Sequence, residues 1–175
     1  MARLRKVLIV LGSDSDWGEM AGAAEVLTQM GIPHEVTVAS AHRTPERVTL
    51  LSQQAQRRGF GVIIAGAGAA ATLAGVIAAQ SPLPVIGVPL APTPLAGFDA
   101  LLATVQMPAG IPVATMAVGS PGARNAALLA ARILALSDAV LRRRLEAHRQ
   151  AMRRQVEAKD RALQKMLLQA KGAPG

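Results

Sequence analysis

Short apolar runs that end in glycine-rich loops recur along this chain, and helix-like segments separate them. This alternation is the pattern of an α/β domain built on a parallel sheet. The first run, Val7–Leu11, is continuous, as expected of a strand that is buried on both faces. The predicted strands are Val7–Leu11, Glu35–Ala39, Gly61–Ala65, Pro84–Val88 and Pro112–Val118.

Helices are predicted over residues 17–30, 45–58 and 69–80, and from the loop 119–122 through Leu136. Asp16 and Glu19 have the spacing of a capping box, which predicts the start of the first helix. Thr44 is the predicted N-cap of the second helix, with Pro45 at its first helical position. Five strands and four helical stretches predict a flavodoxin-like α/β fold, a three-layer sandwich with a five-stranded parallel sheet.

The chain has 175 residues, which suits one domain with a substantial core. We expect a flavodoxin-like domain over residues 1–136 and a basic helical extension over residues 137–175. Residues 138–171 carry a partial apolar stripe at helical spacing. The stripe consists of Leu141, Leu145, His148, Met152, Val156, Leu163, Met166 and Leu167. We expect this long C-terminal helix to pack in an oligomer, the alternative being the flank of its own domain.

The net charge of +8 raises the question of a nucleic-acid partner. Residues 138–175 hold ten of the 19 Lys and Arg residues but only four of the 11 Asp and Glu residues. The basic character therefore belongs to the C-terminal helix, where such a charge run is usually a solvated face. Aromatic residues, which stack on bases, are nearly absent. We expect no nucleic-acid partner; the C-terminal charge alone supports that alternative.

The sequence carries no sign of a membrane segment. Its apolar runs are far shorter than the roughly 20 residues that span a bilayer. Met1–Lys6 leads straight into a predicted strand, an order that does not fit a signal peptide. The absence of cysteine is compatible with a reducing compartment. We therefore expect a cytoplasmic protein without a membrane partner.

The loop after the first predicted strand has the composition of an anion site. In Gly12–Asp16, backbone N–H groups at a helix N-terminus accompany the hydroxyls of Ser13 and Ser15. The carboxylates of Asp14 and Asp16 disfavour an anion, yet a carboxylate can hold ribose hydroxyls, as an acidic residue does in dinucleotide-binding folds. The other interpretation is a capped turn without a ligand, and the loop alone does not separate the two.

The loop after the second predicted strand places His42 next to Arg43. An imidazole titrates near neutrality and can both give and take a proton in one turnover. A guanidinium can hold a carboxylate or phosphate with paired hydrogen bonds. A structural or solvated histidine is the alternative, and the position at a strand's carboxyl end favours a functional one.

The loop after the third predicted strand, residues 66–71, consists of glycine and alanine. Such a segment lets a ligand approach backbone amides and can form the wall of a small apolar cavity. Helix–sheet packing also favours small residues, and this interpretation stays open.

Five segments, in order, resemble those of one family. They are Gly12–Trp17, Ser40–Pro45, Gly66–Gly68, Val105–Val113 and Gly119–Leu136, the last containing Asn125–Ala131. The family is the bacterial N5-carboxyaminoimidazole ribonucleotide mutase, also called the catalytic subunit of phosphoribosylaminoimidazole carboxylase. The resemblance covers residues 6–136, and its specificity comes from the ordered set rather than from any one motif.

The resemblance implies a flavodoxin-like catalytic domain, a homo-octamer, and neither a metal nor an organic cofactor. It implies a small-molecule ribonucleotide substrate whose carbamate carboxylate moves to the ring carbon by decarboxylation and recarboxylation. His42 would supply and then remove the proton, as a general acid and base. Contacts to the substrate would come from Ser13, Asp16, Ser40, Arg43 and Gly68. Further candidates are Ser15, Ala69 and Thr72.

This chain departs from the family at the third loop. Family members usually have Gly-Ala-Gly-Gly-Ala-Ala-His-Leu-Pro-Gly where residues 66–75 read Gly-Ala-Gly-Ala-Ala-Ala-Thr-Leu-Ala-Gly. Thr72 thus replaces a second histidine, which leaves a non-catalytic nucleotide-binding paralog as an alternative. A carboxylase that uses free carbon dioxide is another. Relatives of that kind typically carry lysine after the catalytic histidine, so Arg43 favours the mutase.

Overall fold

The structure, a computed structural model, describes residues 5–171 and contains a five-stranded parallel sheet in the order β2-β1-β3-β4-β5. The strands are β1 (Lys6–Leu11), β2 (His34–Val38), β3 (Phe60–Ala67), β4 (Val85–Pro89) and β5 (Ala114–Thr115). This is the strand order of flavodoxin-like folds, and it confirms the predicted class. The predicted domain and extension also include residues 1–4 and 172–175, which lie outside the described residues.

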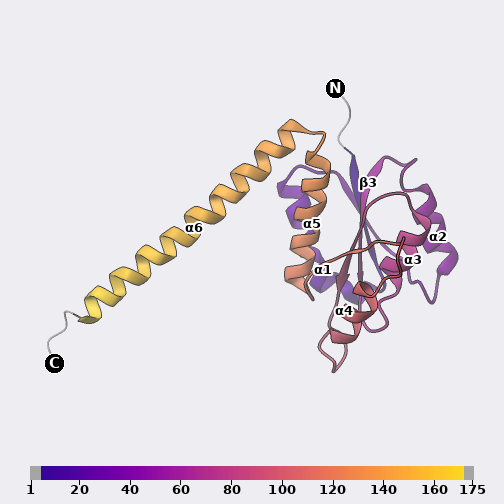
Figure 1. Ribbon diagram of the computed structural model, residues 1–175, viewed down its shortest axis with the longest axis horizontal. Coiled ribbons are helices and arrows are strands. Elements are labelled where there is room, and N and C mark those ends of the chain that lie inside the picture. The colour runs from indigo at the N-terminus through magenta and orange to yellow at the C-terminus, as the bar shows by residue number, and fades with distance from the viewer. Residues whose placement is uncertain (1–4, 172–175) are drawn as a thin grey trace.

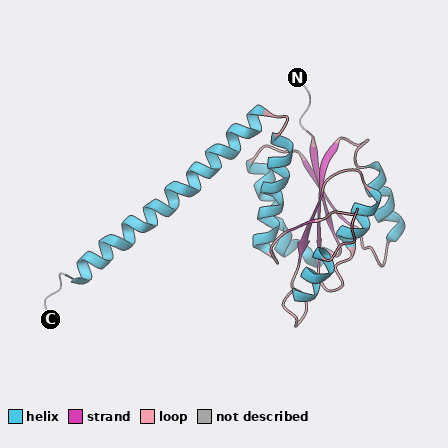
Figure 2. Cartoon of the chain, in the orientation of Figure 1, coloured by secondary structure: helices cyan, strands magenta, loops and turns pink. Residues whose placement is uncertain are grey.

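Helices cover both faces of the sheet (Figures 1 and 2). Helices α1 (Trp17–Gln29) and α5 (Ser120–Ala135) pack on one face, and α2 (Pro45–Gln54) and α3 (Leu73–Gln80) pack on the other. Helix α4 (Phe98–Val105) packs beside β4 and β5. Each face has its own apolar core, because successive strand residues point to opposite faces.

The central strands are held by their fully buried side chains. Ile9, Ile64 and Ile86 are neighbours in the register of β1, β3 and β4, and each is 0% exposed. A buried aliphatic side chain contributes about 1.5–3 kcal/mol relative to an exposed one. This row therefore ties the three central strands together below the edge where their loops leave.

Several predicted boundaries were wrong. The last strand has two residues instead of the predicted 112–118, because only Ala114 and Thr115 pair with β4. Helix α2 ends at Gln54 instead of residue 58, and the chain then turns to Gly59 at a φ of +87°. Helix α3 starts at Leu73 instead of residue 69, because Ala69 and Ala71 have positive φ values that a right-handed helix excludes.

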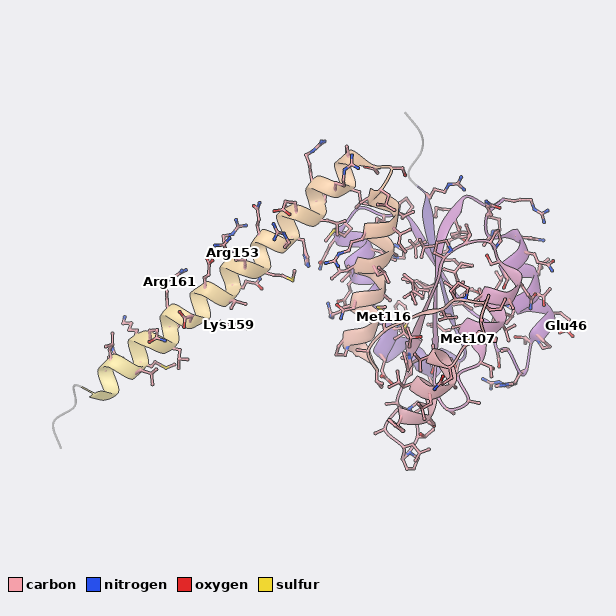
Figure 3. All side chains as sticks on the ribbon, in the orientation of Figure 1. Glu46, Met107, Met116, Arg153, Lys159 and Arg161 are labelled. Atoms are coloured by element: carbon pink, nitrogen blue, oxygen red, sulfur yellow. The ribbon has the colours of Figure 1, made fainter. Side chains whose placement is uncertain are left out.

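The C-terminal helix α6 (Ala139–Lys171) confirms the predicted long helix and extends away from the sheet (Figure 1). Asp138 accepts a hydrogen bond from the Leu141 N–H at 2.8 Å, and Arg144 donates to the Met30 carbonyl at 2.7 Å. Beyond this base, Arg153, Lys159 and Arg161 project into solvent (Figure 3). No helix among residues 5–171 is both long and apolar enough to cross a membrane.

The buried isoleucine row generates a prediction about stability. Ile64→Ala should lower the free energy of unfolding by about 2–5 kcal/mol, because it leaves a cavity in the centre of the sheet. Leu50→Ala is the control: Leu50 is 54% exposed on α2, so we expect a change within about 0.5 kcal/mol. Chemical denaturation measures both, and equal losses would contradict the assignment of the core.

Candidate functional site

One cavity lies at the carboxyl ends of β1, β2 and β3, with a volume of about 360 Å³. It is the place where the strand order reverses, where α/β sheets of this kind bind ligands. All of the candidate residues from the sequence line it: Ser13, Ser15, Asp16, Ser40, His42, Arg43, Gly68, Ala69 and Thr72. The topology thus brings three separate loops into one site.

The loop after β1 is closed by its own aspartate. The Ser13 N–H donates to Asp16 Oδ2 at 2.8 Å, and the Ser15 hydroxyl donates to Ser13 Oγ at 2.9 Å. The predicted capping box of Asp16 and Glu19 was wrong: the box lies three residues earlier, at Ser13 and Asp16. The reason is a short 3₁₀ turn over residues 14–16 that precedes α1, so the first cap belongs to that turn.

Asp16 is a buried acid, with 8% of its surface exposed. Burial raises the pKa of the Asp16 carboxyl above its ordinary value of 3.8, and the backbone N–H of Ser13 partly opposes this shift. The charged form therefore carries a desolvation cost within the protein alone. A ligand hydroxyl that donates to this carboxylate would offset part of that cost.

The loop after β2 is held by its own side chains. The Ser40 N–H donates to Thr44 Oγ1 at 2.9 Å, and the Arg43 N–H donates to Ser40 Oγ at 3.2 Å. Thr44 is the N-cap residue of α2 and Pro45 lies in its first turn, as predicted, but the Thr44 side chain makes no cap hydrogen bond to that helix. Its hydroxyl bonds to Ser40 instead, because the loop folds back on itself over residues 40–44.

Arg43 joins this loop to the loop after β1. Its Nη2 donates to the Gly12 carbonyl at 3.3 Å, while its Nε lies 3.5 Å from Ser40 Oγ. The side chain is exposed, so its remaining N–H groups are accessible to a ligand. A guanidinium in this place gives the cavity a fixed positive charge for a carboxylate or phosphate.

The loop after β3 is strained and tightly packed. Ala69 has a φ of +52° and Ala71 a φ of +32°, in the region that favours glycine. A side chain at position 68 would lie 2.3 Å from Pro92 Cγ, so only glycine fits there. Strained backbone of this kind persists where the surrounding structure enforces it, often at functional sites.

His42 and Thr72 meet across the cavity. Thr72 Oγ1 lies 3.0 Å from His42 Nε2, a hydrogen bond between the loops after β2 and β3. His34 and His148 do not line the cavity. His34 lies in β2 and contacts the Ile32 carbonyl through Nδ1 at 3.1 Å, and His148 lies in α6. Proton transfer within this cavity can therefore involve only one of the three histidines.

Sequence reasoning missed several cavity residues. Pro92 comes from the proline-rich loop after β4, and Leu73 begins α3. Neither carries a polar side chain, so only the position of their loops at the sheet edge could have indicated them. Within residues 5–171, no three His, Cys, Asp or Glu side chains are grouped as a metal site requires. The cavity combines a hydroxyl-rich loop, a cation, an imidazole and an apolar wall.

Comparison with known proteins gives one consistent result. The AIR carboxylase family matches residues 6–155. The N5-carboxyaminoimidazole ribonucleotide mutase of Mycobacterium leprae is 52% identical over 165 residues, covering 94% of this chain and 95% of that protein. The mutase of the same name from Escherichia coli K12 is 52% identical and covers 83% and 86%. A crystal structure of Treponema denticola PurE aligns with a TM-score of 0.79 at 28% identity, covering 90% and 97%.

Asp16 generates a prediction about pH. Because folding raises its pKa, the ionised carboxylate destabilises the protein above the folded pKa, and this effect vanishes below the unfolded pKa. Asn can still accept from the Ser13 N–H but cannot ionise. Asp16→Asn should therefore be at least as stable as the native protein at neutral pH, and this advantage should disappear by about pH 3.

Chemical denaturation at the two pH values tests this, with Asp14→Asn, at an exposed position, as the control. A variant that is less stable than the native protein at neutral pH by more than about 1 kcal/mol would contradict the desolvation argument.

The positive φ of Ala69 generates a second prediction. Ala69→Gly should raise the free energy of unfolding by about 1 kcal/mol, since glycine adopts this conformation without a Cβ clash. Ala70→Gly, one residue on and also exposed, should leave stability unchanged or lower it by up to about 1 kcal/mol. Thermal and chemical unfolding measure the pair, and a destabilised Ala69→Gly protein would show that the loop is not strained there.

Proposed function

The chain belongs to the AIR carboxylase family, and on that premise we propose that it is a mutase of purine biosynthesis. It converts N5-carboxyaminoimidazole ribonucleotide into 4-carboxy-5-aminoimidazole ribonucleotide. The observation that carries this proposal is the convergence of the sequence candidates on one cavity at the switch point. The substrate is inferred from the names of the relatives, and the cavity contains groups that suit each part of that substrate.

The proposed reaction needs one proton carrier. The carbamate N–C bond breaks, His42 donates a proton to the amino nitrogen, and carbon dioxide stays in the cavity. The ring carbon then attacks carbon dioxide, forming the new C–C bond. His42 takes the proton that leaves this carbon, which restores the aromatic ring and returns the imidazole to its starting state. An imidazole can both donate and accept a proton, so it suits both transfers.

Each remaining group has a proposed part of the substrate. The hydroxyls of Ser13 and Ser15 bind the phosphate with the backbone N–H groups of their loop. Asp16 accepts from the ribose hydroxyls. Arg43 and Ser40 hold the carboxylate, where a planar guanidinium can form two hydrogen bonds.

The small residues of the third loop contain the carbon dioxide. Gly68 and Ala69 line the cavity without polar side chains, so the gas has an apolar wall there. Enclosure matters because carbon dioxide must remain near the ring carbon between the two steps.

A carboxylase using free carbon dioxide is the second candidate. The family description names a carboxylase, while the relatives at 52% identity are named mutases. Arg43, directly after His42, also supports the mutase. A non-catalytic paralog is the third candidate, because Thr72 replaces a histidine. Thr72 contacts His42 directly, however, and the cavity still holds an imidazole, a guanidinium, a carboxylate and several hydroxyls.

We further propose a cytoplasmic homo-octamer that needs neither metal nor organic cofactor. The support for assembly lies on α6, where Leu141 is buried and Leu145 is half-buried against the domain, but the stripe from Met152 onward is exposed. Val156 is 66% exposed and Met166 is 60% exposed. Burying apolar surface of this kind against other copies is favourable.

A turnover assay with purified protein tests the function. The mutase converts the carbamate substrate without added bicarbonate and does not need free carbon dioxide. Conversion of aminoimidazole ribonucleotide that depends on bicarbonate, with no use of the carbamate, would establish the carboxylase instead. Binding of the carbamate without turnover would establish the paralog.

The role of His42 generates a prediction about rate. His42→Asn should lower kcat by about 100-fold or more, because asparagine cannot carry a proton in either step. His34→Asn is the matched control, since the asparagine amide can replace the Nδ1 contact to Ile32 and should leave the rate nearly unchanged. If the His42→Asn enzyme keeps more than about a tenth of the native kcat, another group moves the proton.

A further inference from the structure

The hydrogen bond between Thr72 and His42 joins two loops that lie on opposite sides of β1 in the sheet order. The two atoms, Oγ1 and Nε2, are 3.0 Å apart. Both side chains are exposed, so water competes for each of them. The contact therefore depends on how the two loops place these side chains and does not follow from burial.

The Thr72 hydroxyl does not cap helix α3, although capping is the usual role of a threonine at this position. Thr72 is the residue before the first turn of α3, the N-cap position. An N-cap hydroxyl commonly accepts a backbone N–H of its own helix, which stabilises the helix by about 1 kcal/mol. Within the described residues its hydroxyl makes no such cap bond, and it is directed at His42 instead.

The backbone that leads to Thr72 is held in a costly conformation. Ala69 and Ala71 are at positive φ, and Gly68 packs so closely on Pro92 that no other residue fits. Non-glycine residues in such conformations cost on the order of 1 kcal/mol each. Together these constraints delay the start of α3 until Leu73 and leave Thr72 at the cavity wall.

Each ring nitrogen of an imidazole carries one N–H or one lone pair, so Nε2 can bond to Thr72 while Nδ1 exchanges a proton. The Thr72 hydroxyl would accept from the Nε2–H, which is present in the protonated ring and in the neutral ring that has lost its Nδ1 proton. The proposed reaction takes His42 through both of these states in every turnover. The hydrogen bond to Thr72 would persist in both, and Nδ1 would carry the proton.

We propose that Thr72 is a positioning residue for His42: its hydroxyl holds Nε2 in both protonation states and fixes the orientation of the ring. The catalytic consequence rests on the proposed function, whereas the hydrogen bond itself does not. Thr72 thereby replaces the second histidine that the resembling family carries at this position with a neutral group that cannot compete for the proton.

Two variants separate the hydroxyl from the rest of the Thr72 side chain, and a third assigns the His42 signals. Thr72→Val keeps the shape and removes the hydroxyl, and Thr72→Ser keeps the hydroxyl. His42→Asn identifies the His42 signals in ¹⁵N-histidine spectra, in which His34 and His148 serve as internal controls. Thermal unfolding checks that each variant is folded.

We expect the Val variant to move the ¹⁵N resonance of His42 Nε2 and to leave those of His34 and His148 in place. Its kcat should fall about 10- to 100-fold, as expected when a reacting group loses its orientation. The Ser variant should keep the native resonance and a kcat within about threefold of the native value.

The proposal would be overturned by a Val variant with native resonances or a native rate. It would also be overturned by a Ser variant as slow as the Val variant, since the hydroxyl would then not be the operative group. If the native protein turned over no carbamate substrate, the proposed function would fail, while the ¹⁵N resonance would still decide whether Thr72 holds His42.

Discussion

The hydrogen-bonded ladder between β1 and β3 determines where the groups of the site lie. Leu11 pairs with Gly66 at its end, and the Gly12 N–H continues the ladder to the Gly66 carbonyl at 3.0 Å. On the other edge of β1, the Ala39 N–H donates to the Leu11 carbonyl at 2.9 Å. The three loops therefore leave the sheet at one level. Parallel pairing turns three distant segments of sequence into one cavity.

The site keeps features that do not help folding. The buried Asp16 carboxyl, with its raised pKa, and the alanines at positive φ before Thr72 both oppose stability. The apolar cores on the two sheet faces are large enough to offset these terms. Such local conflicts between sequence and stability are expected where a binding or catalytic role selects the residues.

Much of the fold could be predicted because its signals are local. Val7–Leu11 is apolar throughout, and a strand covered on both faces has that pattern. β5 was predicted too long, because Pro112–Val118 has strand composition but only Ala114 and Thr115 pair with β4. The residues that line the cavity could be predicted as a group from the ends of the strands. The contact of Thr72 with His42 could not, because it depends on the backbone angles of Ala69 and Ala71, which alanine does not signal.

In the proposed reaction, a carboxylate moves within one ribonucleotide that stays bound in this cavity. The most direct measurement uses carbamate substrate with ¹³C in its carboxylate, incubated with purified protein in unlabelled bicarbonate. Retention of the ¹³C in the carboxylate of the product is the predicted result, because carbon dioxide stays in the cavity between the two steps. Product with an unlabelled carboxylate would contradict the account, because its carboxylate would then come from free carbon dioxide in solution.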